Sequence, residues 1–406
     1  MISVDVRTRT ANDVRSVDPS AFFGEELPER LRAHAALAAP GATELGVRPF
    51  AFAVDGRAWT VSLDGDEFTV TDGDADAAAI VRLDGEGVDD LVNDLRTPMG
   101  FFTGGDLDMP RGRLEDFLDW WVVLRSVLDE RRVHTTGAVT FTGRDGGPLD
   151  LTRAFRVDDD LDEIGSFLGE AGFVHLENVF TEDEMHAVSE EMDAAMPAYS
   201  PGDNRSWWAT THDGTQRLVR MQYFHTASPT TTALLADDRL QRLATMTPDG
   251  HRLRKPGGNS NIVEALVKPL GVVEGISDVP WHKDCSLGSH SYRCCSMTVG
   301  ISVTGADAES GQLRVVAGSH RALIQPAFVR RNLDLPQVDL PTRTGDVTIH
   351  LSCTLHMSQP PVTRERRVLY TDFSLPEQDG GDPGERKIKR IREGAPTTVS
   401  QPAVRR

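Results

Sequence analysis

Cysteine is scarce in this chain, which has four cysteines among 406 residues. They form no C-x-x-C pair, and Cys294 and Cys295 are adjacent, so the sequence disfavours both a disulfide framework and a thiolate zinc site. The first residues, MISVDVRTRTANDVRS, lack the apolar segment of a secretory signal. Free thiols and the missing signal together predict a cytoplasmic protein.

Long apolar runs and an excess of positive charge are also missing. No apolar run approaches the roughly 20 residues of a transmembrane helix, so we expect no membrane span. Acidic residues number 62 and basic residues 43, which gives a formal net charge of −19. Because nucleic acids bind through basic surfaces, a nucleic-acid partner is disfavoured, and a small-molecule substrate is the expected partner.

The chain is long enough for two domains, and its composition, with 39% hydrophobic and 26% charged residues, is that of a folded protein. We predict a small α+β domain over residues 1–135, a hairpin linker over 136–160, a β-rich domain over 161–376 and a basic tail over 377–406. The tail is expected to be solvated, with a site for an anionic substrate or a neighbouring subunit as the alternative.

The first predicted domain contains a strand meander followed by helices. Its strands lie in FAFAVDGRAWTVSLDGDEFTVTDG, where apolar and polar residues alternate between Asp-Gly turns. Two helices follow, the second in RLEDFLDWWVVLRSVLDE. This order of elements resembles the sterol-carrier-protein-like fold over residues 45–130, which implies a lipid ligand. A scaffold, or a homo-oligomer contact without any ligand, is the alternative.

The second predicted domain begins with helices and continues as short strands. Thr181 and Glu184 have the spacing of a capping box, which predicts a helix from residue 182 onward. After residue 260, short apolar runs alternate with Gly, Pro and Asp, as in a jelly roll or β-sandwich. Between these parts, DNRSWWATTHDGTQRLVRMQYFH is rich in aromatic residues and arginine. We interpret it as a loop that covers the site or packs against the fold.

A metal-binding motif lies in the jelly-roll region. Residues i and i+2 of a strand point to the same side, so a His-x-Asp segment presents two ligands to one ion, as His282 and Asp284 do in WHKD. Chance alone supplies about two His-x-acid triplets in a chain of this composition, and His175 begins a second one. Because His175 lies where a strand enters a capped helix, we interpret it as a structural histidine.

A third ligand and a carboxylate anchor follow in GDVTIHLSCTLHMSQPPVTRERRVLYTDF. His356 lies in this predicted strand, with His350 as a rival for the same role. Two imidazoles and one carboxylate on one face of iron(II) leave open the three positions that oxygen activation requires. A guanidinium can hold the far carboxylate of a co-substrate through two parallel bonds, and the candidates are Arg364, Arg366 and Arg367.

At this point the sequence resembles a known family. Residues 161–376 are similar to the phytanoyl-CoA dioxygenase family in four stretches, FLGEAGFVHLENVFTEDEM, VPWHKD, ESGQLRVVAGSHR and GDVTIHLSCTLHMSQPPVTRERRVLYTDF. The resemblance implies a double-stranded β-helix (jelly roll), with Fe(II) held by His282, Asp284 and His356. It also implies 2-oxoglutarate and O2 as co-substrates.

The same resemblance places the co-substrate. In the family a serine follows two residues after the distal histidine and an arginine follows eleven residues after it, which fall on Ser358 and Arg367. The chain departs from the family where Met357 replaces the usual glycine and where QPP, at 359–361, lacks the usual asparagine. Arg220 is the candidate for a further contact to 2-oxoglutarate, and Arg217 and Lys268 are alternative lining residues.

Asp284 bears on the type of reaction. Relatives that halogenate lack a carboxylate at this position, so its presence favours hydroxylation. We therefore predict an Fe(II)- and 2-oxoglutarate-dependent dioxygenase that hydroxylates a small or medium-sized organic substrate, either lipid-like, acyl or a secondary metabolite, and produces succinate and CO2. The alternatives are a metal-binding sensor or scaffold without catalysis, and a cupin-like metalloenzyme that does not use 2-oxoglutarate.

Overall fold

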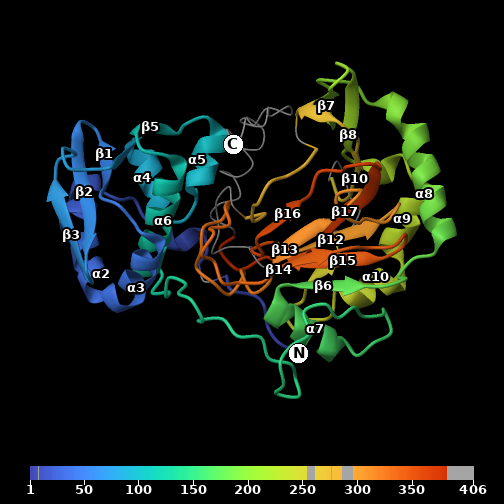
Figure 1. Cartoon of the computed structure of the whole chain (residues 1–406), viewed down its shortest axis with the longest axis horizontal. Helices are drawn as coiled ribbons and strands as arrows, with labels where there is room; N and C mark the ends of the chain where they lie inside the picture. The colour runs from blue at the N-terminus through green and yellow to red at the C-terminus, as the bar shows by residue number, and fades with distance from the viewer. Residues whose placement is uncertain (8, 254–260, 276, 286–295, 382–406) are drawn as a thin grey trace.

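Two blocks of secondary structure make up the molecule, and each has its own hydrophobic cluster (Figure 1). The structure is a computed structural model that describes residues 1–7, 9–253, 261–275, 277–285 and 296–381. The first block runs from blue to cyan in Figure 1, and the second runs from green to red. Within the described residues, no helix is both long enough and apolar enough to cross a bilayer.

A five-stranded sheet in the order β3-β2-β1-β4-β5 forms the first block. Its strands are β1 (Phe50–Val54), β2 (Arg57–Asp64), β3 (Glu67–Asp72), β4 (Ala79–Leu83) and β5 (Asp108–Arg111). Asp55 and Gly56 join β1 to β2, and both have positive φ angles, of 49° and 81°, as two-residue hairpin turns require. The predicted strand meander is therefore present, and β1 has β4 as a parallel neighbour on its other edge.

Helices pack against this sheet and fill the block with aromatic rings. On α6 (Leu114–Leu128), Phe117 lies against Phe50 and Phe52, with ring centroids 5.7 and 6.3 Å apart. Phe23 stacks on Phe52 and Trp59 in the same cluster. The block is α+β, while its likeness to a sterol carrier and its lipid ligand remain predictions. Its other helices are η1 (Ala11–Asp13), α1 (Pro19–Ala21), η2 (Phe22–Glu26), α2 (Leu27–Ala33), α3 (Ala35–Leu45), α4 (Gly85–Val92) and α5 (Pro98–Gly104).

The second block is a jelly roll made of a large and a small sheet. The large sheet has the order β11-β7-β8-β10-β17-β12-β15-β6, with β9 also paired to β17, and the small sheet has the order β14-β13-β16. The large-sheet strands are β6 (Phe173–Leu176), β7 (Ser206–Thr211), β8 (Gln216–Met221), β9 (Arg252–Leu253), β10 (Glu264–Lys268), β11 (Val272–Glu274), β12 (Met297–Ser302), β15 (Val347–Leu351) and β17 (Arg366–Ser374). The small-sheet strands are β13 (Leu313–Val316), β14 (Gln337–Leu340) and β16 (His356–Ser358).

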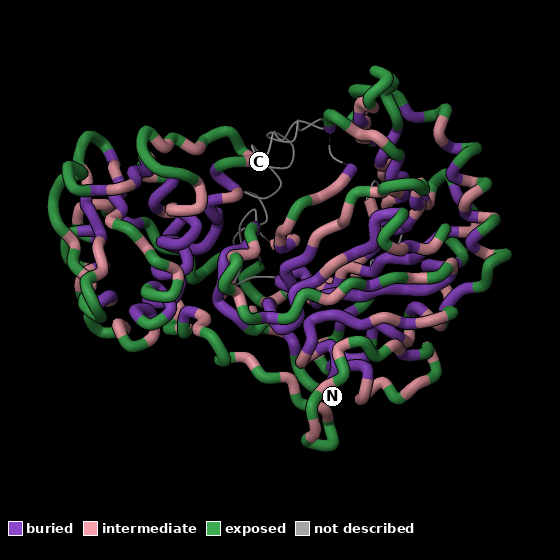
Figure 2. Tube along the Cα trace, in the orientation of Figure 1, coloured by how far each residue is buried: buried purple, intermediate pink, exposed green. Residues whose placement is uncertain are grey.

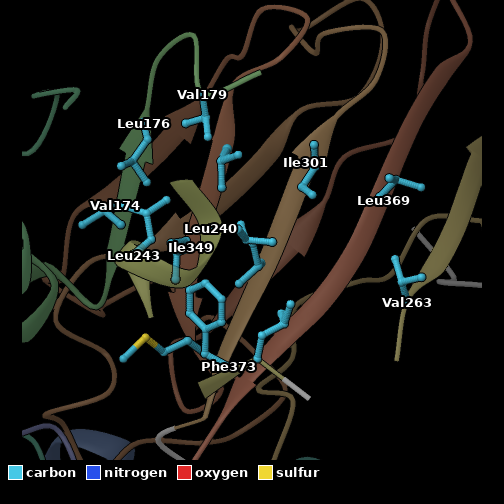
Figure 3. Packing of buried hydrophobic residues seen from close by; sticks show 14 of the residues in the cluster. Val174, Leu176, Val179, Leu240, Leu243, Val263, Ile301, Ile349, Leu369 and Phe373 are labelled. Atoms are coloured by element: carbon cyan, nitrogen blue, oxygen red, sulfur yellow. The ribbon is translucent and has the colours of Figure 1, made fainter. Parts of the chain in front are cut away.

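Helices cover one face of the large sheet. They are α7 (Leu161–Ala171), α8 (Glu182–Ala195), η3 (Met196–Ala198), η4 (Phe224–Thr226), α9 (Pro229–Ala236) and α10 (Asp238–Leu243). Thr181 and Glu184 form the predicted capping box at the start of α8. In Figure 3, Ile301, Ile349 and Leu369 of the sheet share one hydrophobic cluster with leucines of α10.

The opposite face of the large sheet is directed at the small sheet. Figure 2 shows the central strands buried along most of their length. Because side chains alternate along a strand, the residues between those of the hydrophobic cluster point toward the small sheet. Neighbouring residues on that face are His350, Thr298, Asp372 and Tyr370, with Lys268 and Arg366 further along the strands. The interior of the jelly roll is therefore polar on this side.

The two blocks are joined by a hairpin and by direct contacts. Thr142 pairs with Pro148 across the Gly-containing turn that the sequence predicts for the linker. Leu323 of the second block belongs to the hydrophobic cluster of the first. Gln325 and Arg330 both donate hydrogen bonds to the buried carboxylate of Asp119 on α6. The first block is thus packed against the segment that contains residues 323–330.

Candidate metal centre

Three residues from two chain segments form a group that could hold a metal ion. One ligand atom each from His282, Asp284 and His356 lies within 4.8 Å of the others. Oδ1 of Asp284 is 3.4 Å from Nε2 of His282 and 3.7 Å from Nε2 of His356. His282 and His356 are paired through two backbone hydrogen bonds of 2.9 Å, which places their ring centroids 4.2 Å apart. The structure thus brings together the three residues that the sequence predicts as ligands.

Backbone carbonyl groups orient both imidazole rings. Nδ1 of His282 lies 2.8 Å from the carbonyl oxygen of Pro280, and Nδ1 of His356 lies 2.9 Å from that of Thr354. Each Nδ1 therefore carries the proton and donates it, which leaves the lone pair of Nε2 directed at the shared space. Metal-binding histidines in proteins are commonly held in this way.

The electrostatics of the group suit a cation. Burial alone would raise the pKa of the Asp284 carboxyl, but the imidazoles of His356, His282 and His350 outweigh it and hold that pKa well below its usual range. Burial lowers the pKa of His356 well below its usual range, and His350 and His282 lower it further. Asp284 is therefore an anion and His356 is neutral near pH 7, the forms in which both residues bind metals.

The sequence also offers His350 as a rival of His356 and His175 as the start of a second His-x-acid triplet. His350 on β15 is 1% exposed, and its Nε2 lies 3.5 Å from Oδ2 of Asp284, so it lies beside the metal-binding group. His175 on β6 pairs at 3.0 Å with Asp346, the residue before β15, which fits its interpretation as structural. Cys285 and Cys353 form no disulfide among the described residues. Cys294 and Cys295 lie outside the described residues, as do residues 382–406 of the predicted tail.

The structure places Arg367, the predicted anchor of the co-substrate, against α8 and away from the metal-binding group. The Arg367 guanidinium donates to the carbonyl and hydroxyl oxygens of Ser189, both at 3.0 Å, and pairs with Asp193 at 2.8 Å on α8. It therefore lies on the helix-covered face of the large sheet, with Leu369 of the same strand. Arg366 is the residue of β17 that points into the jelly roll, where it is 4% exposed and its Nη2 donates to Oγ of Ser358 at 3.1 Å.

A second cationic side chain, that of Lys268, lies beside Arg366 and contacts the same serine. Nζ of Lys268 donates to Oγ of Ser358 at 2.7 Å and to the carbonyl oxygen of Gln359, and it pairs with Asp278 at 3.1 Å. Its side chain is 1% exposed. Burial, together with the charge of Arg366, lowers the pKa of Lys268 to about 7. We call Lys268 and Arg366, together with Ser358, whose hydroxyl group both contact, the cation group.

Two further candidate arginines, Arg220 and Arg217, are paired with acidic residues. Arg220 pairs with Glu264 at 3.1 Å and lies over the ring of Trp207, 4.3 Å from its centroid. Since Arg220 is opposite Leu266 in the sheet, it shares the inward face with Arg366 two strands away. Arg217 pairs with Glu365 at 3.1 Å and is 49% exposed, so it does not line the interior. The segment that carries both arginines is the β7–β8 hairpin of the large sheet, not a covering loop.

The sequence left open which residues reach the site from distant strands. Lys268 was one of three open candidates, and Thr298, whose hydroxyl donates to Oδ2 of Asp284 at 2.6 Å, was not considered. The alternation of side chains along β17 could have identified Arg366 as the arginine that points into the jelly roll. Leu369 and Phe373 belong to the core, so Arg367 shares their side of β17 and Arg366 takes the other.

The chain was also compared with known protein families and solved structures. Residues 168–368 match the phytanoyl-CoA dioxygenase (PhyH) family, a range that includes the metal-binding group. No curated protein matches the chain. Similar solved structures include the non-heme alpha ketoglutarate dependent epimerase SnoN from nogalamycin biosynthesis, at 20% identity and a TM-score of 0.42, over 53% of this chain and 80% of that chain. EctD from S. alaskensis with 2-oxoglutarate and 5-hydroxyectoine is another, at 17% identity and a TM-score of 0.43, over 60% and 86% of the two chains.

Proposed function

Through residues 168–368 the chain belongs to the phytanoyl-CoA dioxygenase family of iron- and 2-oxoglutarate-dependent oxygenases, and we propose that it hydroxylates a small or medium-sized organic substrate. One observation carries the proposal: the metal-binding group and the cation group share the short strand β16. His356 and Ser358 are two residues apart on the same side of this strand, about 6.6 Å along it. That separation suits a diacid bound to the metal at one end and to the cations at the other.

The ligand set suits Fe(II). Two imidazole nitrogens and one carboxylate oxygen on one face of the ion are the ligands of non-haem iron oxygenases, and they leave three positions open. With iron bound, two of these positions would be available to 2-oxoglutarate and one to O2. When bound, the iron supplies the O2-dependent oxidation that converts 2-oxoglutarate to succinate and CO2 and hydroxylates the substrate.

The cation group supplies the anchor for the far carboxylate of 2-oxoglutarate. Buried charges are costly unless they are paired, and here Arg366 and Lys268 lie side by side with one hydroxyl group between them. Asp278 balances one of the two charges. A carboxylate that accepts hydrogen bonds from Arg366 and Ser358 would balance the other, in the charge-assisted geometry that guanidinium favours.

Hydroxylation is the reaction that Asp284 favours, because halogenating relatives lack this carboxylate. The substrate is proposed to be lipid-like, acyl or a secondary metabolite, and Arg220, on the inward face of β8, is proposed to contact 2-oxoglutarate or substrate. The first block is proposed to bind a lipid or to contact another copy of the chain. A sensor or scaffold without catalysis, and an enzyme that does not use 2-oxoglutarate, are the alternatives.

The first test is turnover without added substrate. Protein purified without oxygen is expected to convert 2-oxoglutarate to succinate slowly when Fe(II) and O2 are supplied, because these oxygenases often turn over their co-substrate in an uncoupled reaction. Succinate is measured by mass spectrometry, with EDTA-treated protein as the control. Binding of Fe(II) and 2-oxoglutarate without succinate would favour a sensor, and a reaction with O2 that needs no 2-oxoglutarate would favour the cupin-like alternative.

The low pKa of Lys268 predicts a pH-dependent affinity for 2-oxoglutarate. Since the pKa is about 7, the amine is charged below pH 7 and neutral above it. The KM for 2-oxoglutarate is therefore expected to rise between pH 6.5 and pH 8.5, by up to about tenfold per pH unit. Lys268→Met should raise the KM at pH 6.5 and flatten the profile, while Lys268→Arg should keep the KM low at both pH values. A wild-type KM that does not vary with pH would contradict this role.

A further inference from the structure

The two oxygens of Asp284 have different surroundings. Oδ1 faces the Nε2 atoms of His282 and His356, at 3.4 and 3.7 Å. Oδ2 faces the large sheet, where it accepts a hydrogen bond of 2.6 Å from the hydroxyl of Thr298. Nε2 of His350 lies 3.5 Å from the same oxygen. One oxygen is thus turned toward the shared space of the ligands, and the other is turned away from it.

The second group beside Oδ2 is the buried imidazole of His350. It is 1% exposed, and neither Nδ1 nor Nε2 has a hydrogen-bond partner among the described residues. Its ring lies against that of His356, with centroids 4.1 Å apart. A movement of about 0.3 to 0.5 Å would bring Nε2 into the ordinary range of a hydrogen bond to Oδ2 of Asp284. Since a buried imidazole nitrogen without a partner is costly, Oδ2 is the acceptor that this ring lacks.

Thr298 and His350 reach Asp284 as a pair. They are directly opposite each other on the neighbouring strands β12 and β15, so their side chains lie on the same face of the large sheet. Asp284 approaches from the other side, where its backbone N–H donates to the carbonyl oxygen of Ser352 at 2.9 Å. A hydroxyl group and an imidazole from adjacent strands therefore converge on one carboxylate oxygen.

We propose that Thr298 and His350 are positioning residues that keep Oδ2 of Asp284 away from the metal, so that the carboxylate binds through Oδ1 alone. This inference rests on the proposed function. A carboxylate can bind a metal through one or both oxygens. If Asp284 used both, the protein would occupy four of six positions, and 2-oxoglutarate would take the last two. No position would remain for O2, so holding Oδ2 outside keeps the third position open.

The test uses the full-length protein with Co(II), which reports binding and coordination number by its visible absorption without turnover. In Thr298→Val, which has nearly the same shape but no hydroxyl, we expect Co(II) affinity to fall about 10- to 100-fold. The visible spectrum of the Co(II) protein should also change before and after 2-oxoglutarate is added. Thr298→Ser keeps the hydroxyl and should remain within about threefold of wild type. His350→Phe should weaken binding in the same direction.

Thr348→Val is the matched control. Thr348 lies on β15 two residues before His350, on the same face of the sheet, and its hydroxyl makes no hydrogen bond among the described residues. This variant should bind Co(II) and 2-oxoglutarate as the wild type does. If Thr298→Val bound both with wild-type affinity and spectrum, or if both valine variants lost binding equally, the positioning role would be overturned. If the wild type bound neither Co(II) nor 2-oxoglutarate, the proposed function would fail, and this proposal with it.

Discussion

The His356→Ala variant is expected to lose Fe(II)-dependent succinate formation by at least a factor of about 100. His356 supplies one of the three ligands and is 5% exposed, so removal of its ring leaves the ion with two protein ligands. His282 and Asp284 alone would bind the ion weakly. The measurement is succinate formed at saturating 2-oxoglutarate over a range of Fe(II) concentrations, beside equilibrium binding of Co(II).

His175→Gln is the control for this experiment. His175 begins the other His-x-acid triplet, and its ring pairs with Asp346 instead of a second histidine. This variant should lose stability but keep metal-dependent turnover once it is folded. The outcome that would contradict the ligand assignment is retained turnover in His356→Ala together with loss of metal binding in His350→Phe. In that case His350 would be the distal ligand.

Arg366→Met is expected to raise the KM for 2-oxoglutarate about 100-fold, whereas Arg367→Met is expected to change it less than about threefold. The first value corresponds to about 2.7 kcal/mol, a usual cost for removing one partner of a buried, charge-assisted contact. Arg366 donates to Ser358 inside the jelly roll, whereas Arg367 binds Ser189 and Asp193 outside it. The measurement is the KM for 2-oxoglutarate in uncoupled succinate formation.

Each variant is the matched control for the other, because both replace one arginine of β17 with methionine and differ only in the face of the sheet that is affected. The Arg367→Met variant should instead lower the thermal unfolding temperature, since it breaks contacts between β17 and α8. If the KM rose mainly in Arg367→Met, the family's eleven-residue spacing would hold in solution and the orientation of β17 described here would be wrong.

The choice between Arg366 and Arg367 shows the limit of what residue spacing in the sequence can predict. In the family pattern the anchor follows eleven residues after the distal histidine, which is Arg367, yet the tenth residue, Arg366, points inward. The segment QPP at 359–361 lacks the asparagine that is usual in the family. A connection that is one residue shorter or longer reverses which face of the next strand each side chain takes. The parity of β17 is set by the packing of Leu369 and Phe373 against the helices, and spacing from His356 does not contain that information.

The sequence by itself determined the features that depend on neighbouring residues. His282 and Asp284 lie two positions apart, Thr181 and Glu184 cap α8, and the Asp-Gly turn joins β1 to β2, because each pattern acts within a few residues of chain.

Only the tertiary structure decided which side chains from separate strands meet. Lys268 and Ser358 are 90 residues apart, and Thr298 and His350 come from different strands to one oxygen of Asp284. The hydrogen bonds from Gln325 and Arg330 to Asp119 in the first block also join residues that are far apart in the sequence. Such contacts depend on the register and face of paired strands, which the packing of the whole sheet sets and no local pattern encodes.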